Sequence, residues 1–430
     1  MKKIAFLLLI LLCLPLICCG VKPQEHSSET AAPGGPGNGK TRPSTDYDNS
    51  RPCGFTNFIS TDDAYYYVGS RIGCYIYYYD KASGESDVLC SRPECTHDAT
   101  DANDDCNGFV SGMIGQLFDY YQGKLYCIGG PMRTTVYRMN PDSTQREELF
   151  RLDADENFDY RFTPQRIAIH RGKLYGMNWA QAVVEDGIPV NSWNITSWDL
   201  ETGEFKPVCE ERADGAPRMF FYENYLYFCV SAAEYEYPEN EDEDPILIGN
   251  RIKIYRYDTE TEQLEKLFED ISLDYPGSLY AIWVKSEDEV YVAPQYWDEQ
   301  PTKVFCLSDG KLAEAVTVES GDGIVLSDDR IFAFGSVQDA DENIIGMHLT
   351  VMDYESNVLF DGDVPIDSVL GISGKTSRKR VGYSGGCIAD NAFFIVYRLR
   401  DDGLNPSCIV KYERIDGKMQ ETVIAVSKFG

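Results

Sequence analysis

Histidine and basic side chains are scarce in this chain. Only 4 histidines occur among 430 residues, and 39 lysines and arginines stand against 70 aspartates and glutamates, for a formal net charge of −31. Lysine and arginine are needed to neutralise phosphates, so this balance argues against a nucleic-acid partner and against attraction to anionic lipid. Chance pairing among 70 acids is certain, so no pair of carboxylates can be singled out as catalytic. A strongly negative net charge is typical of a protein that is kept soluble at a cell surface by its charge.

Long hydrophobic runs are also missing. The longest apolar stretch, Ile4 to Ile17, has roughly 14 residues and is shorter than the about 20 residues that a membrane-spanning helix needs. Lys2 and Lys3 precede it and supply a positive n-region. This arrangement predicts an export signal over residues 1–18.

The end of the apolar stretch resembles a lipobox. Leu16 stands three places before Cys19, and Gly20 follows it. We expect cleavage before Cys19 and lipid attachment to its thiol, which would anchor the protein at the extracellular face of the cell membrane. The alternative is an ordinary secretory signal that ends in two incidental cysteines, Cys18 and Cys19.

The segment 19–50 is predicted to be a disordered tether. Serine, glycine, proline, threonine and asparagine dominate it, and such a composition cannot bury enough apolar surface to offset the entropy of ordering. We expect it to hold a single folded domain, residues 51–430, away from the membrane.

Seven short aromatic-rich segments recur about every 55 residues in that domain. Each combines an apolar strand with a turn. The segments are Ala64–Tyr67, Lys124–Tyr126, Lys173–Tyr175, Tyr225–Tyr227, Glu289–Tyr291, Arg330–Phe332 and Ala392–Phe394. A strand repeat of this length predicts an all-β fold, a β-propeller of seven four-stranded blades, with six or eight as alternatives. The expected blades cover 55–90, 114–151, 161–209, 215–269, 275–318, 322–362 and 380–426.

A turn signature follows the third strand of several repeats. An aspartate, small polar residues and often a glycine occupy four or five positions, as in Asp80–Gly84, Asp199–Gly203 and Asp258–Thr261. Aspartate accepts hydrogen bonds from nearby backbone amides, and glycine takes positive φ. These acids are therefore predicted to be structural and not catalytic.

Long connections fall on one face of the expected disc. They cover 91–113, 179–192, 232–250, 335–345 and 363–379, and the connection 232–250 includes the strongly acidic run 234–244. Insertions gathered on one face often mark a binding side, and drift in unconstrained loops explains them equally well. The acidic run and the basic run 375–380 could each recognise a charged partner or serve only as solvated loops.

One segment concentrates reactive side chains. Cys90, Cys95, His97 and Cys106 lie within 17 residues. Three thiolates and one imidazole form a known structural zinc set, although the spacing is looser than in a zinc finger. A disulfide between Cys106 and either Cys90 or Cys95 is an alternative in an exported protein, and free thiols are a third.

The remaining cysteines predict no disulfide scaffold. Eleven would remain after lipidation of Cys19, and an odd number excludes full pairing. Most lie in strand patterns among aromatics and are expected to be small buried side chains. A calcium loop beginning at Asp101 is disfavoured, because Cys106 and Gly112 stand where glycine and glutamate are required.

The run Val88–Asp98 contains the pattern Leu-Cys-x-x-Pro-x-Cys-x-His. Together with the lipobox and the tyrosine-rich first repeat, it resembles a group of uncharacterised β-propeller lipoproteins from gut-dwelling Firmicutes. The resemblance implies the propeller fold and a surface location. It implies no activity.

The function that these features favour is recognition. A lipid-anchored propeller would bind a glycan, a peptide or a protein partner, with Trp179, Trp193 and Trp297 as the first exposed contacts to test. The alternative is an extracellular lyase or glycosidase with its site at the central channel, which should place carboxylates and a histidine on the innermost strands. A purely architectural role in an envelope complex is a third possibility.

Overall fold

The computed structural model describes residues 58–427 with short internal gaps, the longest of which are 69–73, 98–102, 239–244, 295–300, 373–380 and 400–406. All of the described residues belong to one compact unit. The expected signal, Cys19 and the tether lie outside the described residues. Within the described part, no helix is long and apolar enough to cross a membrane.

Seven antiparallel sheets make up this unit, each built from consecutive strands. The first sheet contains β1 (Phe58–Ser60), β2 (Ala64–Val68), β3 (Cys74–Asp80), β4 (Ser86–Val88) and β5 (Phe109–Val110), and the second contains β6 (Phe118–Tyr121), β7 (Lys124–Gly129), β8 (Thr135–Met139) and β9 (Glu147–Arg151). The third contains β10 (Arg166–His170), β11 (Lys173–Glu185), β12 (Ile188–Asp199) and β13 (Phe205–Arg212). The fourth contains β14 (Arg218–Tyr222), β15 (Tyr225–Glu236), β16 (Ile246–Asp258) and β17 (Leu264–Ser272).

The last three sheets are β18 (Tyr280–Ser286), β19 (Glu289–Pro294), β20 (Thr302–Ser308) and β21 (Lys311–Val318); β22 (Gly323–Leu326), β23 (Ile331–Gln338), β24 (Ile344–Met352) and β25 (Val358–Pro365); and β26 (Val381–Ala389), β27 (Ala392–Leu399), β28 (Ser407–Ile415) and β29 (Lys418–Ser427). Three short helices are described: η1 (Pro131–Arg133), η2 (Leu152–Ala154) and α2 (Asp367–Ile372).

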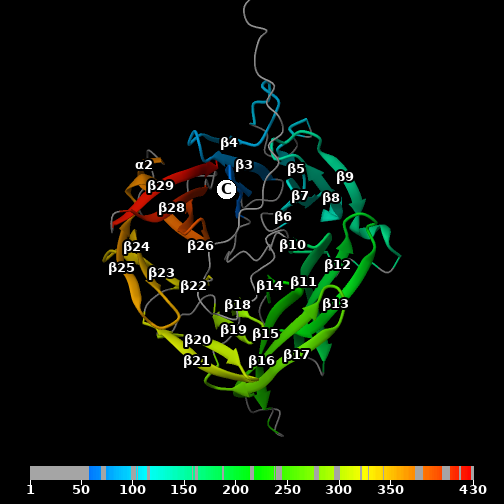
Figure 1. Ribbon diagram of the computed structural model, residues 1–430, viewed down its shortest axis with the longest axis vertical. Helices are drawn as coiled ribbons and strands as arrows, with labels where there is room; N and C mark the ends of the chain where they lie inside the picture. The colour runs from blue at the N-terminus through cyan, green and yellow to red at the C-terminus, as the bar shows by residue number, and fades with distance from the viewer. Residues whose placement is uncertain are drawn as a thin grey trace, which may run out of the picture. The chain divides into compact units, whose positions relative to one another are not determined.

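The sheets are the blades of a seven-bladed β-propeller (Figure 1). The first strand of each blade lies near the centre, and the first strands of several successive blades pack on one another, as β6 does on β10 and β18 on β22. The predicted fold class, blade number and approximate blade boundaries are confirmed.

Burial decreases from the second strand of a blade to the fourth. Every residue of β2 is buried, whereas most residues of the fourth strands β17 and β25 are exposed or half-buried. A second strand is covered on both faces by the neighbouring blades, which is why it tolerates tyrosine on both sides. Tyr67 and Tyr77 are cross-strand partners whose rings stack with centroids 5.1 Å apart. Such aromatic pairs stabilise a sheet beyond their burial alone.

The hairpin between the third and fourth strands is held by its aspartate. Asp80 Oδ1 accepts hydrogen bonds from the amides of Ala82 and Ser83, at 3.0 and 2.6 Å. Gly84 then takes a φ of 74°. Asp199, Asp258 and Asp353 accept amide hydrogen bonds in the same way. The structural role predicted for the turn aspartates is confirmed.

The ring is closed by side chains at the contact between the first and last blades. Among the described strands, none from the C-terminal end joins the sheet of β1–β4. Phe58 and Tyr65 of the first blade instead pack on Phe394 of the last, with ring centroids 4.5 and 5.1 Å apart. We call this contact the seam.

A charged group completes the seam at the turn between β26 and β27. Lys81 Nζ lies 2.6 Å from Asp390 Oδ2, and Ser60 Oγ donates to the same carboxylate at 3.0 Å. Burial opposes ionisation of Asp390, but the hydrogen bonds from Lys81, Tyr65 and Ser60 outweigh it and hold the pKa of this carboxyl below its usual value.

Asp390→Asn is expected to weaken the seam at neutral pH. A carboxyl whose folded pKa is depressed contributes stability above its unfolded pKa of about 3.9 and loses that contribution as pH falls through the folded value. The pair is partly exposed, so we expect a loss of about 1 kcal/mol at pH 7 and a smaller loss at pH 3. Urea unfolding of both proteins at the two pH values measures it. Asp341→Asn, at an exposed turn position, is the matched control, and an equal loss at both pH values would contradict the assignment.

Candidate metal centre

The fourth strand of the first blade is divided into two pieces by an insertion. β4 pairs with β3 through Tyr77↔Val88, and β5 pairs with the same strand through Tyr75↔Phe109. Both pieces run in the same direction along β3, so β5 continues the path that β4 leaves. The chain leaves the sheet after Val88 and rejoins it at Phe109, two positions further along β3, and we call residues 89–108 the insert.

The two ends of this insert meet at Ile76. Its amide donates to the carbonyl of Gly108 at 2.8 Å, and its carbonyl accepts from the amide of Leu89 at 2.8 Å. A Cβ atom on Gly108 would lie 2.3 Å from the Leu89 carbonyl oxygen. We call this closed base of the insert, Leu89 and Gly108 on either side of Ile76, the neck.

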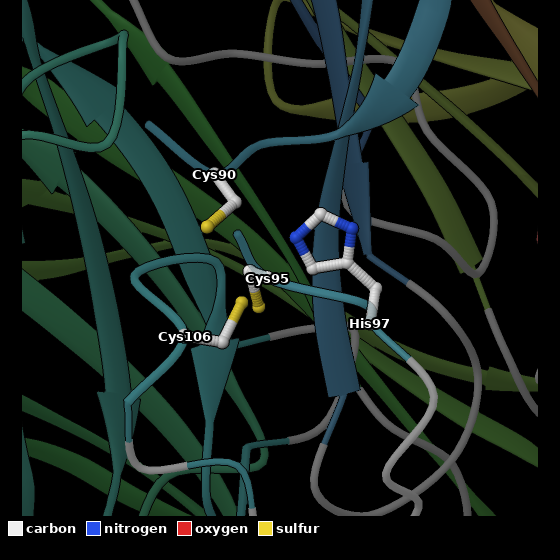
Figure 2. Close-up of side chains that lie close together, drawn as sticks. All are labelled: Cys90, Cys95, His97 and Cys106. Carbon is white, nitrogen blue, oxygen red and sulfur yellow. The ribbon is translucent and has the colours of Figure 1, made fainter. Parts of the chain in front are cut away.

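Four metal-ligating side chains gather beside the neck (Figure 2). Cys90 directly follows Leu89, and Cys106 comes two residues before Gly108, so the two ends of the insert each supply one thiol. Cys95 and His97 come from the turn between them. The three sulfur atoms and one imidazole nitrogen all lie within 4.8 Å of one another. The residues predicted to act together are therefore brought together.

Hydrogen bonds within the insert hold the turn in place. The amide of Cys95 donates to the Arg92 carbonyl at 3.2 Å, and the amide of Cys106 donates to the Asn103 carbonyl at 2.8 Å. The Arg92 side chain bridges the two parts by donating to the carbonyl of Asp105. These contacts fix the thiols at their positions in the chain.

His97 is held in a conformation that is uncommon for a residue with a side chain. Its φ is 52°, in the left-handed region. The imidazole meets the ring of Tyr75 edge-on, with centroids 6.0 Å apart. Its Nε2 is shielded from solvent and has no hydrogen-bond partner among the described residues. The backbone turn thus directs an imidazole toward the thiols.

The thiols differ in their readiness to ionise. Burial disfavours the thiolate of Cys90, but the neighbouring His97 imidazole and the backbone amides of Arg92 and Asn107 outweigh burial and lower its pKa to about 7. Deeper burial raises the pKa of Cys106 to about 12, although the amide of Gly108 opposes this rise. Amides directed at sulfur are the donors that a thiolate ligand requires.

The insert is also attached to the second blade, and one of its cysteines belongs to the apolar cluster shared by the first and last blades. Ser143 Oγ, in the second blade, accepts from the amide of Ser91 at 2.9 Å, and Arg146 donates to the Phe109 carbonyl at 2.6 Å. On its other side, fully buried Cys106 belongs to the apolar cluster that includes Phe394 and Ile424 of the last blade. The site therefore lies where three blades meet.

Gly108→Ala is expected to open the neck. The added methyl group would overlap backbone atoms of Leu89, which cannot move aside cheaply, so we expect a loss of about 1–3 kcal/mol. Thermal unfolding of the purified protein measures it. Gly371→Ala is the matched control, because a methyl group added at this position in α2 would have nothing within 4 Å. Equal melting temperatures for the two variants would contradict the close contact.

Two of the three tryptophans predicted as exposed loop contacts lie in strands. Trp179 and Trp193 are cross-strand partners in β11 and β12, so the predicted loop 179–192 is wrong and consists mostly of extended strands. Trp193 is half-buried and packs on the apolar cluster between the third and fourth blades. Trp297 lies outside the described residues. The sequence pattern missed that these two hairpin strands continue well beyond their neighbours.

The innermost strands carry little chemistry. Their described residues include one carboxylate, Asp119, and one imidazole, His170. Asp119 accepts from the amide of Ile169 at 2.6 Å, and His170 Nε2 contacts the carbonyl of Glu223 at 2.9 Å. Both connect one blade to the next, as expected for a buried structural histidine.

One segment of the last blade matches a serine-hydrolase motif. Residues Gly382–Gly386 read Gly-Tyr-Ser-Gly-Gly and match the Gly-x-Ser-x-Gly pattern of nucleophile elbows. They lie within strand β26. A nucleophile elbow requires a sharp turn from a strand into a helix, so this segment does not form one.

No protein-family model and no curated protein matches the chain. Among solved structures, TolB from Acinetobacter baumannii is 14% identical with a TM-score of 0.36, over 87% of this chain and 79% of TolB. The propeller domain of the Trilobed protease from Pyrococcus furiosus is 11% identical with a TM-score of 0.36, over 88% and 84%. An acylaminoacyl peptidase from Pyrococcus horikoshii is 12% identical with a TM-score of 0.38, over 71% of this chain and 51% of the peptidase, so the chain spans about half of that enzyme.

Proposed function

We propose that this protein is a lipid-anchored recognition module on the extracellular face of the cell membrane, and that its propeller binds a protein partner through the end of the β15–β16 hairpin. The observation that carries the proposal is an uncovered group of large apolar side chains at that end. The scarcity of carboxylates and imidazoles on the described inner strands supports binding over catalysis.

The hairpin extends beyond the rest of its blade. The first strand, β14, reaches only as far as Cys229 of β15, and the outer strand, β17, reaches only Asn250 of β16. β15 and β16 continue to pair up to Glu236↔Ile246. Their ends therefore form a two-stranded ribbon with no further strand on either side among the described residues. A ribbon of this kind is marginally stable without packing on one of its faces.

The ribbon exposes side chains that a solvent-facing segment would not need. Ile246, Leu247 and Ile248 are 58%, 44% and 44% exposed, and Tyr235, the partner of Leu247, is 42% exposed. Successive strand residues point to opposite faces, so Ile246 lies on the other face of the ribbon from Leu247 and Tyr235. Single exposed apolar residues are ordinary, but exposed apolar side chains on both faces of one ribbon end mark an interaction site. We call these four residues the apolar tip.

The charge around the apolar tip indicates the chemistry of the partner. Exposed Glu236 lies on the ribbon, and the run 237–244 that follows it in the sequence is rich in acids, among them Glu241 and Glu243. Apolar residues that adjoin an acidic run in the sequence are complemented by an apolar pocket with a basic border, and such complementarity accelerates and orients association. We therefore expect a protein surface with lysines and arginines around an aliphatic-binding depression.

The apolar tip is tested by the triple substitution Ile246→Ser, Leu247→Ser and Ile248→Ser. Photo-cross-linking from position 247 in living cells identifies the partner, which is then purified and titrated against the wild type and the variant. Loss of a few buried aliphatic side chains is expected to weaken binding at least about tenfold, and added salt should weaken the wild-type complex.

The matched control is Val358→Ser with Leu359→Ser, because these residues are similarly exposed on the outer strand β25 of another blade. The control should bind as tightly as the wild type. Equal cross-linking from positions 247 and 358, unchanged affinity of the triple variant, or glycan-array binding that the triple variant retains would contradict a protein partner at this ribbon.

The anchor is tested separately through Cys19. Cells grown with an alkyne-bearing palmitate analogue should label the wild-type protein, and Cys19→Ser should abolish the label and release the protein from the membrane fraction, since no thiol remains at the lipobox position. Cys18→Ser is the matched control and should remain labelled. Label retained by Cys19→Ser would overturn the anchor without affecting the apolar tip.

A further inference from the structure

We propose that Cys90, Cys95, His97 and Cys106 bind one Zn²⁺ ion that closes the neck of the insert and completes the outer strand of the first blade. This inference is independent of the proposed partner. It chooses among the three interpretations that the spacing of the residues leaves open: a metal, a disulfide and free thiols.

The donor set determines the class of ion. Three thiols and one imidazole contain soft and borderline ligands only, and no carboxylate belongs to the group. Calcium and magnesium require several oxygen ligands, so they do not suit it. Zinc binds Cys3His sets in a closed tetrahedron and has no redox chemistry, which suits a structural site with no open position.

The geometry is close to that of a formed site. Zn–S bonds of about 2.3 Å place tetrahedral sulfur ligands about 3.8 Å apart. The four ligand atoms already lie within 4.8 Å of one another, so small side-chain rotations would complete the tetrahedron. Any disulfide would use only two of the three thiols, and in the structure all three are free. It would leave the His97 imidazole without a role.

The surroundings supply the second layer of contacts that such a site needs. The amides of Arg92 and Gly108, each two residues after a cysteine ligand, are directed at the thiols of Cys90 and Cys106. Asn103 donates to the Tyr75 hydroxyl at 3.0 Å and lies 3.9 Å from Cys95 Sγ. Donors of this kind stabilise thiolate charge and hold the ligands in place.

The ion would act as a connection within the chain. The insert interrupts a strand after Val88 and rejoins it at Phe109, so the outer edge of this blade lacks backbone continuity. Zinc bound to Cys90 at one end and Cys106 at the other would join the two pieces across the neck. Because the amide of Ser91 in the insert donates to Ser143 of the second blade, the ion would also steady the contact between these two blades.

The experiment is metal analysis of the purified full chain. We expect one zinc per chain by elemental mass spectrometry, with Cys90, Cys95 and Cys106 protected from alkylation until a chelator removes the metal. X-ray absorption at the zinc edge should show three sulfur ligands and one nitrogen ligand. Removal of the ion should lower the melting temperature, and added zinc should restore it.

Matched variants locate the site. Cys95→Ser and His97→Ala should each lose most of the zinc, whereas Cys306→Ser and His348→Ala, at half-buried positions outside the cluster, should keep it. Far-ultraviolet circular dichroism establishes that each variant is folded. His97→Cys, unlike His97→Ala, should bind zinc, because the new cysteine supplies a fourth thiolate. A metal-free chain with a disulfide among the three cysteines, or zinc retained equally by Cys95→Ser and His97→Ala, would overturn the proposal.

Discussion

The structure depends on the burial of each blade between two others. Strands such as β2 and β27 are covered on both faces, so nearly all of their residues must be apolar or aromatic, and their side chains must interlock with those of the adjacent sheets. The constraint repeats around the ring and ends at the seam, where Phe58 and Phe394 pack together and the described strands of the two blades form no common sheet. Side-chain packing therefore joins the first and last blades, and Asp119 and His170 on the inner strands connect neighbouring blades.

That packing leaves two kinds of position for function. The outer strand of a blade is exposed along one edge, so it can be interrupted without loss of the core, as the insert between β4 and β5 shows. The hairpin between the second and third strands can grow past the blade, as β15 and β16 do. A stabilising ion at the first position and a partner at the second are compatible, because they lie in different blades and share no residues. Neither requires chemistry at the centre of the ring.

Much of the architecture could be predicted from local patterns. The recurrence of segments such as Lys124–Tyr126 and the turns at Asp80 and Asp199 identified seven blades, because a hairpin leaves its signature within a few residues. The residues at which the strands end were harder to predict from the sequence. Trp193 was expected in an exposed loop and lies in an extended, half-buried strand, since the length of a ladder depends on which neighbours cover it. The exposure of the apolar tip could not be predicted from the sequence for the same reason.

Residue types and short spacings were enough to establish that the chain repeats as strands and hairpins, that its first folded repeat carries three thiols and an imidazole, and that its charge is strongly negative. Folding into the ring added what no local pattern contained: Cys90 and Cys106 meet across a neck at Ile76, and Ile246 is left uncovered. Both depend on how distant segments pack. Local spacing constrains the path of a short segment of chain, whereas proximity and exposure are set by every blade around it.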